Sequence, residues 1–116
     1  MNIFVLHEDP VEAALAHCDS HVIKMILETT QMLCTVQALA GTPIDGGYEP
    51  THQNHPCTRW IRESISNYNW AARLLTALHT VYAHRFCKEH ASKRLLTTLV
   101  TAPVGDIMER TPFVFA

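Results

Sequence analysis

The segment from His17 to Val36 is the feature that most constrains the fold of this chain. If it forms a helix, at about 100° per residue, its polar and ionisable side chains fall within an arc of roughly 80°. Apolar side chains cover most of the remaining circumference. A helix of this kind packs inside a domain, and its polar side chains then need partners or a water-filled pocket. We call these side chains the polar stripe: His17, His21, Lys24, Glu28, Gln31 and Thr35.

We interpret the polar stripe as one wall of a binding or catalytic site. Imidazoles, an ammonium and a carboxylate are the groups that hold anions and transfer protons in proteins. The alternative interpretation is structural. In that case His17 and His21 begin the helix at the surface, and the pair Lys24 and Glu28 forms an exposed i,i+4 ion pair.

Composition limits the classes of protein to which the chain can belong. With 116 residues, it is expected to form a single domain, residues 1–116. Hydrophobic residues make up 47% and charged residues 17% of the chain, which favours buried helices. The net charge of −2 with neutral histidines gives no general basic surface for a nucleic-acid backbone, so any phosphate recognition must be local.

The four cysteines show no CxxC spacing, and we find no secretory signal before them. We therefore expect reduced thiols in a cytoplasmic protein. Cys18, beside two histidines, could be an activated thiol, but an inert cysteine is the commoner case. Uninterrupted apolar runs are only a few residues long, so no segment is expected to span a membrane.

The N-terminal half predicts an extended arm and two helices. Residues 2–6 are mostly β-branched or aromatic, and without a partner strand they should pack as an arm against helices. Asp9 and Pro10 predict the start of a short helix, with Asp9 as its N-cap. A second cap after Cys18 predicts a break before the long helix, which should end at Gly41.

The central part predicts a loop and a third helix. Residues 41–54 contain three of the four glycines and predict a long loop, a kind of segment that is often functional. Asn54 and His55 precede Pro56, which suits the first position of a helix, with Asn54 as the expected cap. Small polar residues at 64–67 weaken helix propensity and predict a bend.

The C-terminal part predicts two further helices. Residues 68–86 carry apolar side chains at 3.6-residue spacing, and this face includes Trp70. Ser92 is the expected cap of a last helix that ends near Val100. Pro112 and its neighbours predict an irregular end of the chain. The expected architecture is therefore all-α, a compact bundle of four to five helices with an extended N-terminal arm.

Residues 51–56, Thr-His-Gln-Asn-His-Pro, form the second candidate site. Free N–H groups at a helix start attract anions such as phosphate, and Arg59, one turn later, could reach the same anion. Simple capping is the alternative, and for Asn54 alone we prefer it. His17, His21, His52 and His55 could together ligate a divalent metal ion, but no known metal-binding spacing is present, and we predict no cofactor.

These patterns assign roles to ten residues. Proton transfer suits the histidines, with a carboxylate to orient a lysine or a water molecule. The remaining residues would hold the substrate. We predict catalytic roles for His17, His21, His55 and Glu28, and substrate contacts for Asn2, Lys24, His52, Asn54, Arg59 and Tyr68.

Several strings resemble a family of small proteins from tailed phages and large DNA viruses. They are MNIFVL followed by EDP, HCDSHVIKMILE, THQNHPCTRW, NYNW and YAHRF. The resemblance covers the chain to about His90 and implies a location in the cytoplasm of a host cell. Members of that family continue past the region of residues 112–113, so this chain is expected to be a shorter form.

The predicted outline also resembles, more distantly, the pyrimidine-dimer DNA glycosylases, which are compact all-α repair enzymes of phages. Those enzymes attack a sugar carbon with an N-terminal amine and use a glutamate on their first long helix. In this chain Asn2 follows the initiator methionine, and the corresponding helix carries Lys24 and histidines, with Glu28 one turn further. The resemblance implies a glycosylase-like fold and a ligand of the nucleotide class.

Three functional hypotheses follow. The first is an enzyme that cleaves a phosphodiester or glycosidic bond in a nucleotide or nucleic acid. The second is an anti-defence protein that sequesters or degrades a cyclic-nucleotide immune signal of the host. The third is a non-catalytic inhibitor of another protein, with the polar stripe facing its partner. The sequence leaves the oligomeric state open, a homo-oligomer included.

Overall fold

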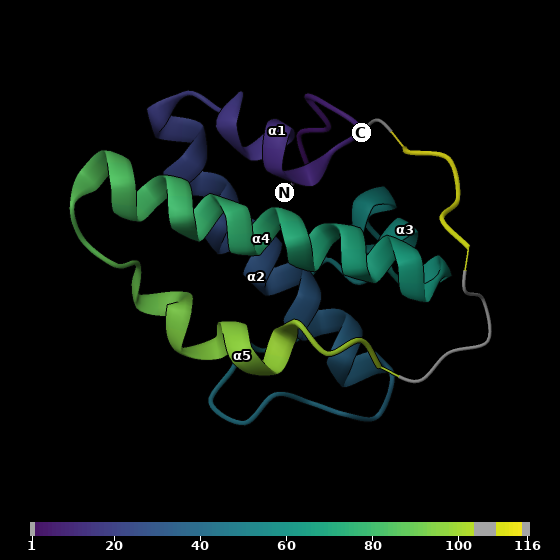
Figure 1. The fold of residues 1–116 in the computed structure, drawn as a ribbon. Coiled ribbons are helices and arrows are strands. Elements are labelled where there is room, and N and C mark those ends of the chain that lie inside the picture. The colour runs from purple at the N-terminus through teal and green to yellow at the C-terminus, as the bar shows by residue number, and fades with distance from the viewer. Residues whose placement is uncertain (1, 104–108, 115–116) are drawn as a thin grey trace.

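The computed structural model describes residues 2–103 and 109–114. Within them the fold is all-α, as predicted, with no strand. Helices α2 (Asp19–Leu39) and α4 (Ile65–Phe86) pack against each other at the centre. Helix α1 (Pro10–Leu15) lies along α4, and α3 (Pro56–Glu63) contacts both long helices. After α4 the chain turns back, so that a 3-10 helix, η1 (Ala91–Leu95), and α5 (Leu96–Leu99) pack against α2 (Figure 1).

The first two helices begin and end where local chemistry predicts. The side chain of Asp9 accepts hydrogen bonds from the N–H groups that open α1, and Pro10 occupies its first position. Cys18 is extended between α1 and α2, which confirms the predicted break, but Cys18 is itself the N-cap of α2 and makes no side-chain cap hydrogen bond, so the cap predicted after it is wrong. Helix α2 stops before Gly41, whose φ of 86° lies in the left-handed region that suits glycine.

Two helix starts differ from the prediction, because a histidine caps where Asn54 and Ser92 were expected. The Nδ1 atom of His55 accepts from the N–H of Cys57 at 3.1 Å. A residue before proline is held in an extended conformation, which is also the conformation of an N-cap, so Pro56 makes His55 the cap. Before η1, His90 accepts from the N–H of Ser92 in the same way.

The bend between α3 and α4 is confirmed, but it is sharper than predicted. Only Ser64 is extended there, with φ −154° and ψ 158°, and its hydroxyl caps α4 by accepting from the N–H of Asn67. Helix α4 therefore begins at Ile65, three residues earlier than the predicted start at Tyr68. A good side-chain cap outweighs the weak helix propensity of the polar residues that follow it.

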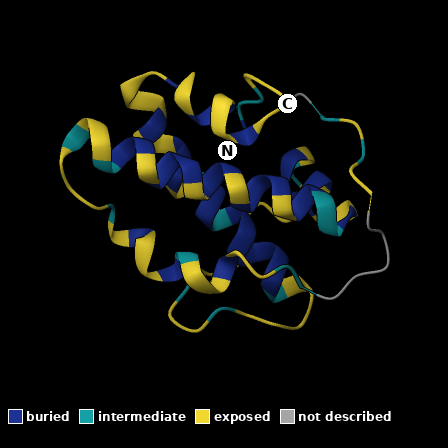
Figure 2. Ribbon diagram, viewed as in Figure 1, coloured by how far each residue is buried: buried dark blue, intermediate teal, exposed yellow. Residues whose placement is uncertain are grey.

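Buried residues line the facing sides of the two long helices (Figure 2). Trp60 and Trp70 are 2% and 4% exposed, so both belong to the core, as the spacing predicted for Trp70. Some of the buried polar groups are paired across elements. Gln37 donates from Nε2 to the hydroxyl of Tyr68 at 2.9 Å and to the carbonyl of Thr101 at 2.8 Å. In the part of the chain that the structure describes, no helix combines the length and apolarity of a membrane span.

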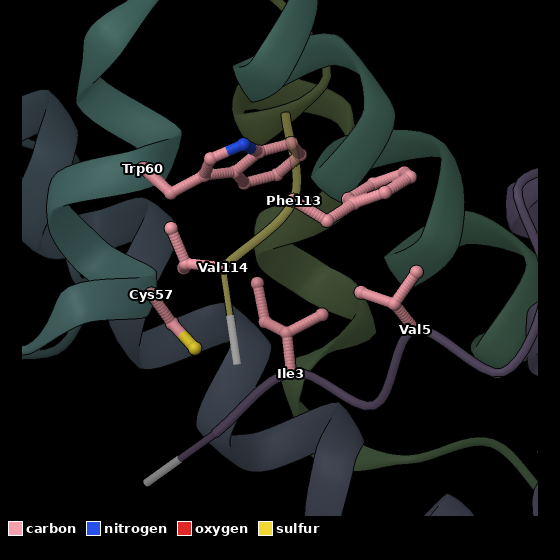
Figure 3. Close-up of a pocket in the computed structure, with 6 residues that line it drawn as sticks. All are labelled: Ile3, Val5, Cys57, Trp60, Phe113 and Val114. Carbon is pink, nitrogen blue, oxygen red and sulfur yellow. The ribbon is translucent and has the colours of Figure 1, made fainter. Parts of the chain in front are cut away.

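The C-terminal residues 109–114, here called the strap, cover the bend between α3 and α4. Asn67 donates to the hydroxyl of Thr111 and accepts from its N–H. Phe113 packs on both core tryptophans, with ring centroids 5.3 Å from Trp60 and 5.1 Å from Trp70. The strap meets the N-terminal arm over a gap of only about 10 Å³ (Figure 3). The residues around this gap are Ile3, Val5, Cys57, Trp60, Phe113 and Val114.

Candidate functional site

The end of the 41–54 loop is fixed to the C-terminal part of α2. The Oγ1 atom of Thr35 donates to the carbonyl of Thr51 at 3.2 Å and accepts from the N–H of the same residue at 3.1 Å. The chain then forms a turn in which the N–H of His55 donates to the carbonyl of His52 at 3.0 Å. His52 has a φ of 47°, a conformation that is uncommon for a residue with a side chain. Two histidines are thus held next to α2 by backbone geometry.

Electrostatic interactions show which ionisable groups act on His55 at this turn. The pKa of His55 lies below its ordinary value, first because the ring is partly buried, and His52 shifts it in the same direction. Glu28, half-buried on α2, acts on His55 in the opposite direction. One residue of the polar stripe and both histidines of the second candidate site therefore interact electrostatically, although Glu28 lies 24 and 27 positions from the two histidines in sequence.

The cap at α3 determines what His55 can do. Its Nδ1 atom accepts the N–H of Cys57, so in the neutral ring the proton is on Nε2. A neutral imidazole in this tautomer is a hydrogen-bond donor toward a ligand and has no free lone pair with which to take a proton. His55 is thus suited to holding a phosphate oxygen through the hydrogen bond that its Nε2–H donates.

The polar stripe is buried only in part. His21 and Lys24 are exposed, and Thr35 is fully buried. The ring of His21 packs on Phe4 of the N-terminal arm, with centroids 4.8 Å apart. In residues 2–103 and 109–114 no side-chain hydrogen bond occupies the His21 ring, so both of its nitrogens are open to a ligand. Arg59, exposed on α3, lies one helical turn after His55.

His17 lies in the junction between α1 and α2, where it is 2% exposed. Its Nδ1 atom donates to the carbonyl of Ala13 at 2.6 Å. Arg85 reaches the same junction from α4 and donates to the carbonyl of His17 at 2.6 Å and to the carboxylate of Asp19 at 3.1 Å. Burial lowers the pKa of His17. These contacts connect α1, α2 and α4, and they leave His17 buried while His21 and Lys24 are exposed.

Three of the predicted substrate contacts lie in other settings. Tyr68 is 1% exposed, and its hydroxyl donates to the carbonyl of Leu99 at 2.7 Å, so it is a core residue. Asn2 accepts from the thiol of Cys57 at 3.3 Å, which attaches the arm to α3. Asn54 is exposed in the turn before the cap. Among the described residues, no group of three or more His, Cys, Asp or Glu side chains is arranged to hold a metal ion.

Sequence reasoning missed the residues that position this site. Thr35 gave no sign that it would fix residue 51, because the pair is 16 positions apart and either threonine could have faced solvent. Phe4 could be read only as an apolar residue of the arm. The chain matches no protein-family model, no curated protein and no solved structure, so both family resemblances stay predictions.

Proposed function

We propose that this protein binds a phosphate-bearing ligand of the nucleotide class at the junction of α2 and α3 and acts on it there. The observation that carries the proposal is the attachment of residue 51 to α2, which places the strained His52 and the helix-capping His55 beside the helix that carries Glu28. Strained backbone conformations persist where the surrounding structure enforces them, and they cluster at functional sites. We call this surface the junction face: His21, Lys24, Glu28, His52, His55 and Arg59.

Each side of the junction face supplies a group that suits a phosphate. On α3, the Nε2–H of His55 and the guanidinium of Arg59 are hydrogen-bond donors, and the helix start adds a favourable dipole. On α2, Lys24 lies one turn before Glu28 and adds a positive charge. These three side chains and the helix start, against one carboxylate, give a local positive field on a chain whose net charge is −2.

In the catalytic form of the proposal, His21 and Glu28 have separate roles. His21, with both ring nitrogens open, takes a proton from the attacking water, and His55 donates to the oxygen on which negative charge develops. Glu28 orients Lys24 or that water molecule. The bond that breaks is a phosphodiester or a glycosidic bond, which are the two cleavable linkages of this ligand class.

A second candidate function is sequestration of a nucleotide signal without cleavage. The tautomer of His55 favours it, because a ring whose Nδ1 is used for capping supplies binding more readily than proton transfer. The two candidates share one binding surface and differ in the fate of the ligand.

Calorimetric titration with inorganic phosphate, adenosine monophosphate and a cyclic diadenylate tests the proposal. Replacing His52 or Lys24 by alanine is expected to weaken binding about tenfold each, the equivalent of 1.4 kcal/mol. His84→Ala, which removes an exposed histidine from the far part of α4, is the matched control and should bind normally. Absence of binding to all three probes would refute the proposal.

The fate of the ligand separates the two candidates. After incubation the protein is denatured and the released nucleotide is analysed by mass spectrometry. Cleaved product that disappears in His21→Ala supports the enzyme, because that variant removes the proposed base from an exposed position. Intact nucleotide recovered in stoichiometric amount supports sequestration.

A further inference from the structure

A buried histidine lies outside the junction face. His79, in the second half of α4, is 4% exposed. Within the described residues, neither of its ring nitrogens has a hydrogen-bond partner. A buried polar group without a partner costs about 1–3 kcal/mol, and in native structures such a group usually has a role. The environment of His79 indicates what that role is.

His79 packs against the part of the chain that turns back after α4, residues 88–99, which we call the return segment. The ring of His90 stands edge-on to His79, with centroids 6.0 Å apart and planes at 76°. Tyr82, one turn further along α4, contacts the same His90 ring at 5.4 Å. The first residues of the return segment are therefore attached to α4 by the packing of the His90 ring on the His79 ring.

His90 also starts η1. Its Nδ1 atom accepts from the N–H of Ser92 at 3.1 Å and lies 2.8 Å from the hydroxyl of the same, buried residue. Only a ring with an unprotonated Nδ1 can accept these bonds. The start of the return segment thus requires His90 to be neutral, and the apolar contact with His79 requires that ring to be neutral as well.

The groups that face His79 come from two neighbouring elements. His90 and Glu89 belong to the connection after α4, and Lys93 belongs to η1. Burial is the largest effect and lowers the pKa of His79 to about 4, with His90 and Lys93 acting in the same direction and Glu89 against them. Burial also lowers the pKa of His90.

We infer that His79 and His90 form a proton-controlled attachment of the return segment, which acid releases from α4. A protonated His79 would bury a charge to which no acceptor is hydrogen-bonded, because the nearby carboxylate of Glu89 is paired with Lys93. A protonated His90 would turn its Nδ1–H toward the N–H of Ser92, donor against donor. Both events favour a state in which the two rings are separated and hydrated.

Release would extend to the long loop. Arg94, in η1, donates from Nη1 to the carbonyl of Gly46 at 2.8 Å. This hydrogen bond links the return segment to residues 41–54. The opposite end of this loop is fixed separately by Thr35. Acid should therefore loosen residues 43–48 together with the return segment and leave α2 and the first half of α4 protected.

Hydrogen–deuterium exchange of the full chain at several pH values tests the inference. Protection factors, already corrected for the intrinsic pH dependence of exchange, are compared between pH 7.5 and pH 5. If only the lowered pKa of His79 is considered, the segment of residues 90–99 should open about 30-fold more often at pH 5, and its amides should lose protection by the same factor. Amides in the centre of α2 should change far less.

Variants identify the groups responsible. His90→Asn keeps a capping acceptor without a titrating ring, and His79→Leu keeps an apolar side chain of similar size. Each is expected to reduce the pH dependence, and together they should abolish it. His84→Asn, on the exposed side of the same helix, should behave as the wild type. Equal opening of the return segment at the two pH values in the wild type would overturn the inference. A pH dependence of exchange that survives in the double variant would also overturn it. If His79→Leu does not fold, the test rests on His90→Asn, and an undiminished pH dependence in that variant would overturn the inference.

Discussion

The hydroxyl of Tyr68 accepts a hydrogen bond from Gln37 and donates one to the carbonyl of Leu99, so a single oxygen connects α2, α4 and α5. Tyr68→Phe removes that oxygen, so the carbonyl of Leu99 loses its donor and the Nε2 atom of Gln37 keeps only its bond to Thr101. We expect the free energy of unfolding to fall by about 1–3 kcal/mol, measured by urea denaturation. Tyr82→Phe is the matched control, because the Tyr82 hydroxyl makes no hydrogen bond in the described part of the chain. An equal loss in both variants would contradict the prediction.

Thr35 offers a second test, at the edge of the junction face. Thr35→Val keeps the shape of the side chain but loses both hydrogen bonds to residue 51. The variant should unfold about 1–2 kcal/mol more easily and should bind nucleotide more weakly, since His52 and His55 are no longer held near Glu28. In Thr76→Val the lost hydroxyl bonds only within its own helix, so calorimetry should show unchanged binding there.

The packing of the strap on the core can be measured by the fluorescence of Trp60 and Trp70. Phe113→Ala removes the ring that packs on both indoles and should cost about 2 kcal/mol of stability, below the range for a fully buried phenylalanine because Phe113 is half-buried. Water then reaches Trp60 and Trp70, so the fluorescence maximum should move to longer wavelength. Phe86→Ala, whose ring contacts Tyr82, should leave that maximum in place.

The free energy of unfolding should depend on pH because His79 is protonated at different pH values in the folded and unfolded states. Its pKa is lowered from 6.5 to about 4 in the folded chain, so the unfolded state binds the proton first as the pH falls. The neutral His79 ring contributes about 3 kcal/mol to the free energy of unfolding above pH 6.5. This contribution is lost progressively as the pH falls from 6.5 to about 4. Urea denaturation at pH 7.5 and pH 4.5 measures it. A difference of the same size in His79→Leu would show that other groups are responsible.

Elements governed by neighbouring residues could be predicted from the sequence. Asp9 with Pro10 starts α1, and Gly41 ends α2, because the cap and the left-handed residue act within a single turn. The caps of α3 and η1 could not be predicted by preference alone. There His55 is selected by the conformation that the following proline imposes, and His90 by its contact with a helix that ends several residues earlier.

Positions that depend on distant contacts were harder to place. Tyr68 has the same apolar spacing whether its hydroxyl faces a ligand or the core, and only Gln37 and residue 99 decide between the two. The strap has no helical or strand periodicity, so nothing in its own sequence shows that Phe113 packs on two tryptophans. The polar stripe was read as a single wall, whereas the α1–α2 junction buries His17 and leaves His21 exposed.

The four cysteines divide into two kinds, and this gives the protein built-in chemical reporters. Cys18 and Cys87 are exposed, so a thiol reagent should modify them at once. Cys34 lies under the long loop, close to Gly47, and Cys57 lies under the arm and the strap. Each buried thiol reacts only when the segment that covers it moves away. The rate of alkylation at position 34 therefore measures how often the long loop opens, and the rate at position 57 measures how often the arm and the strap open, without a label being introduced.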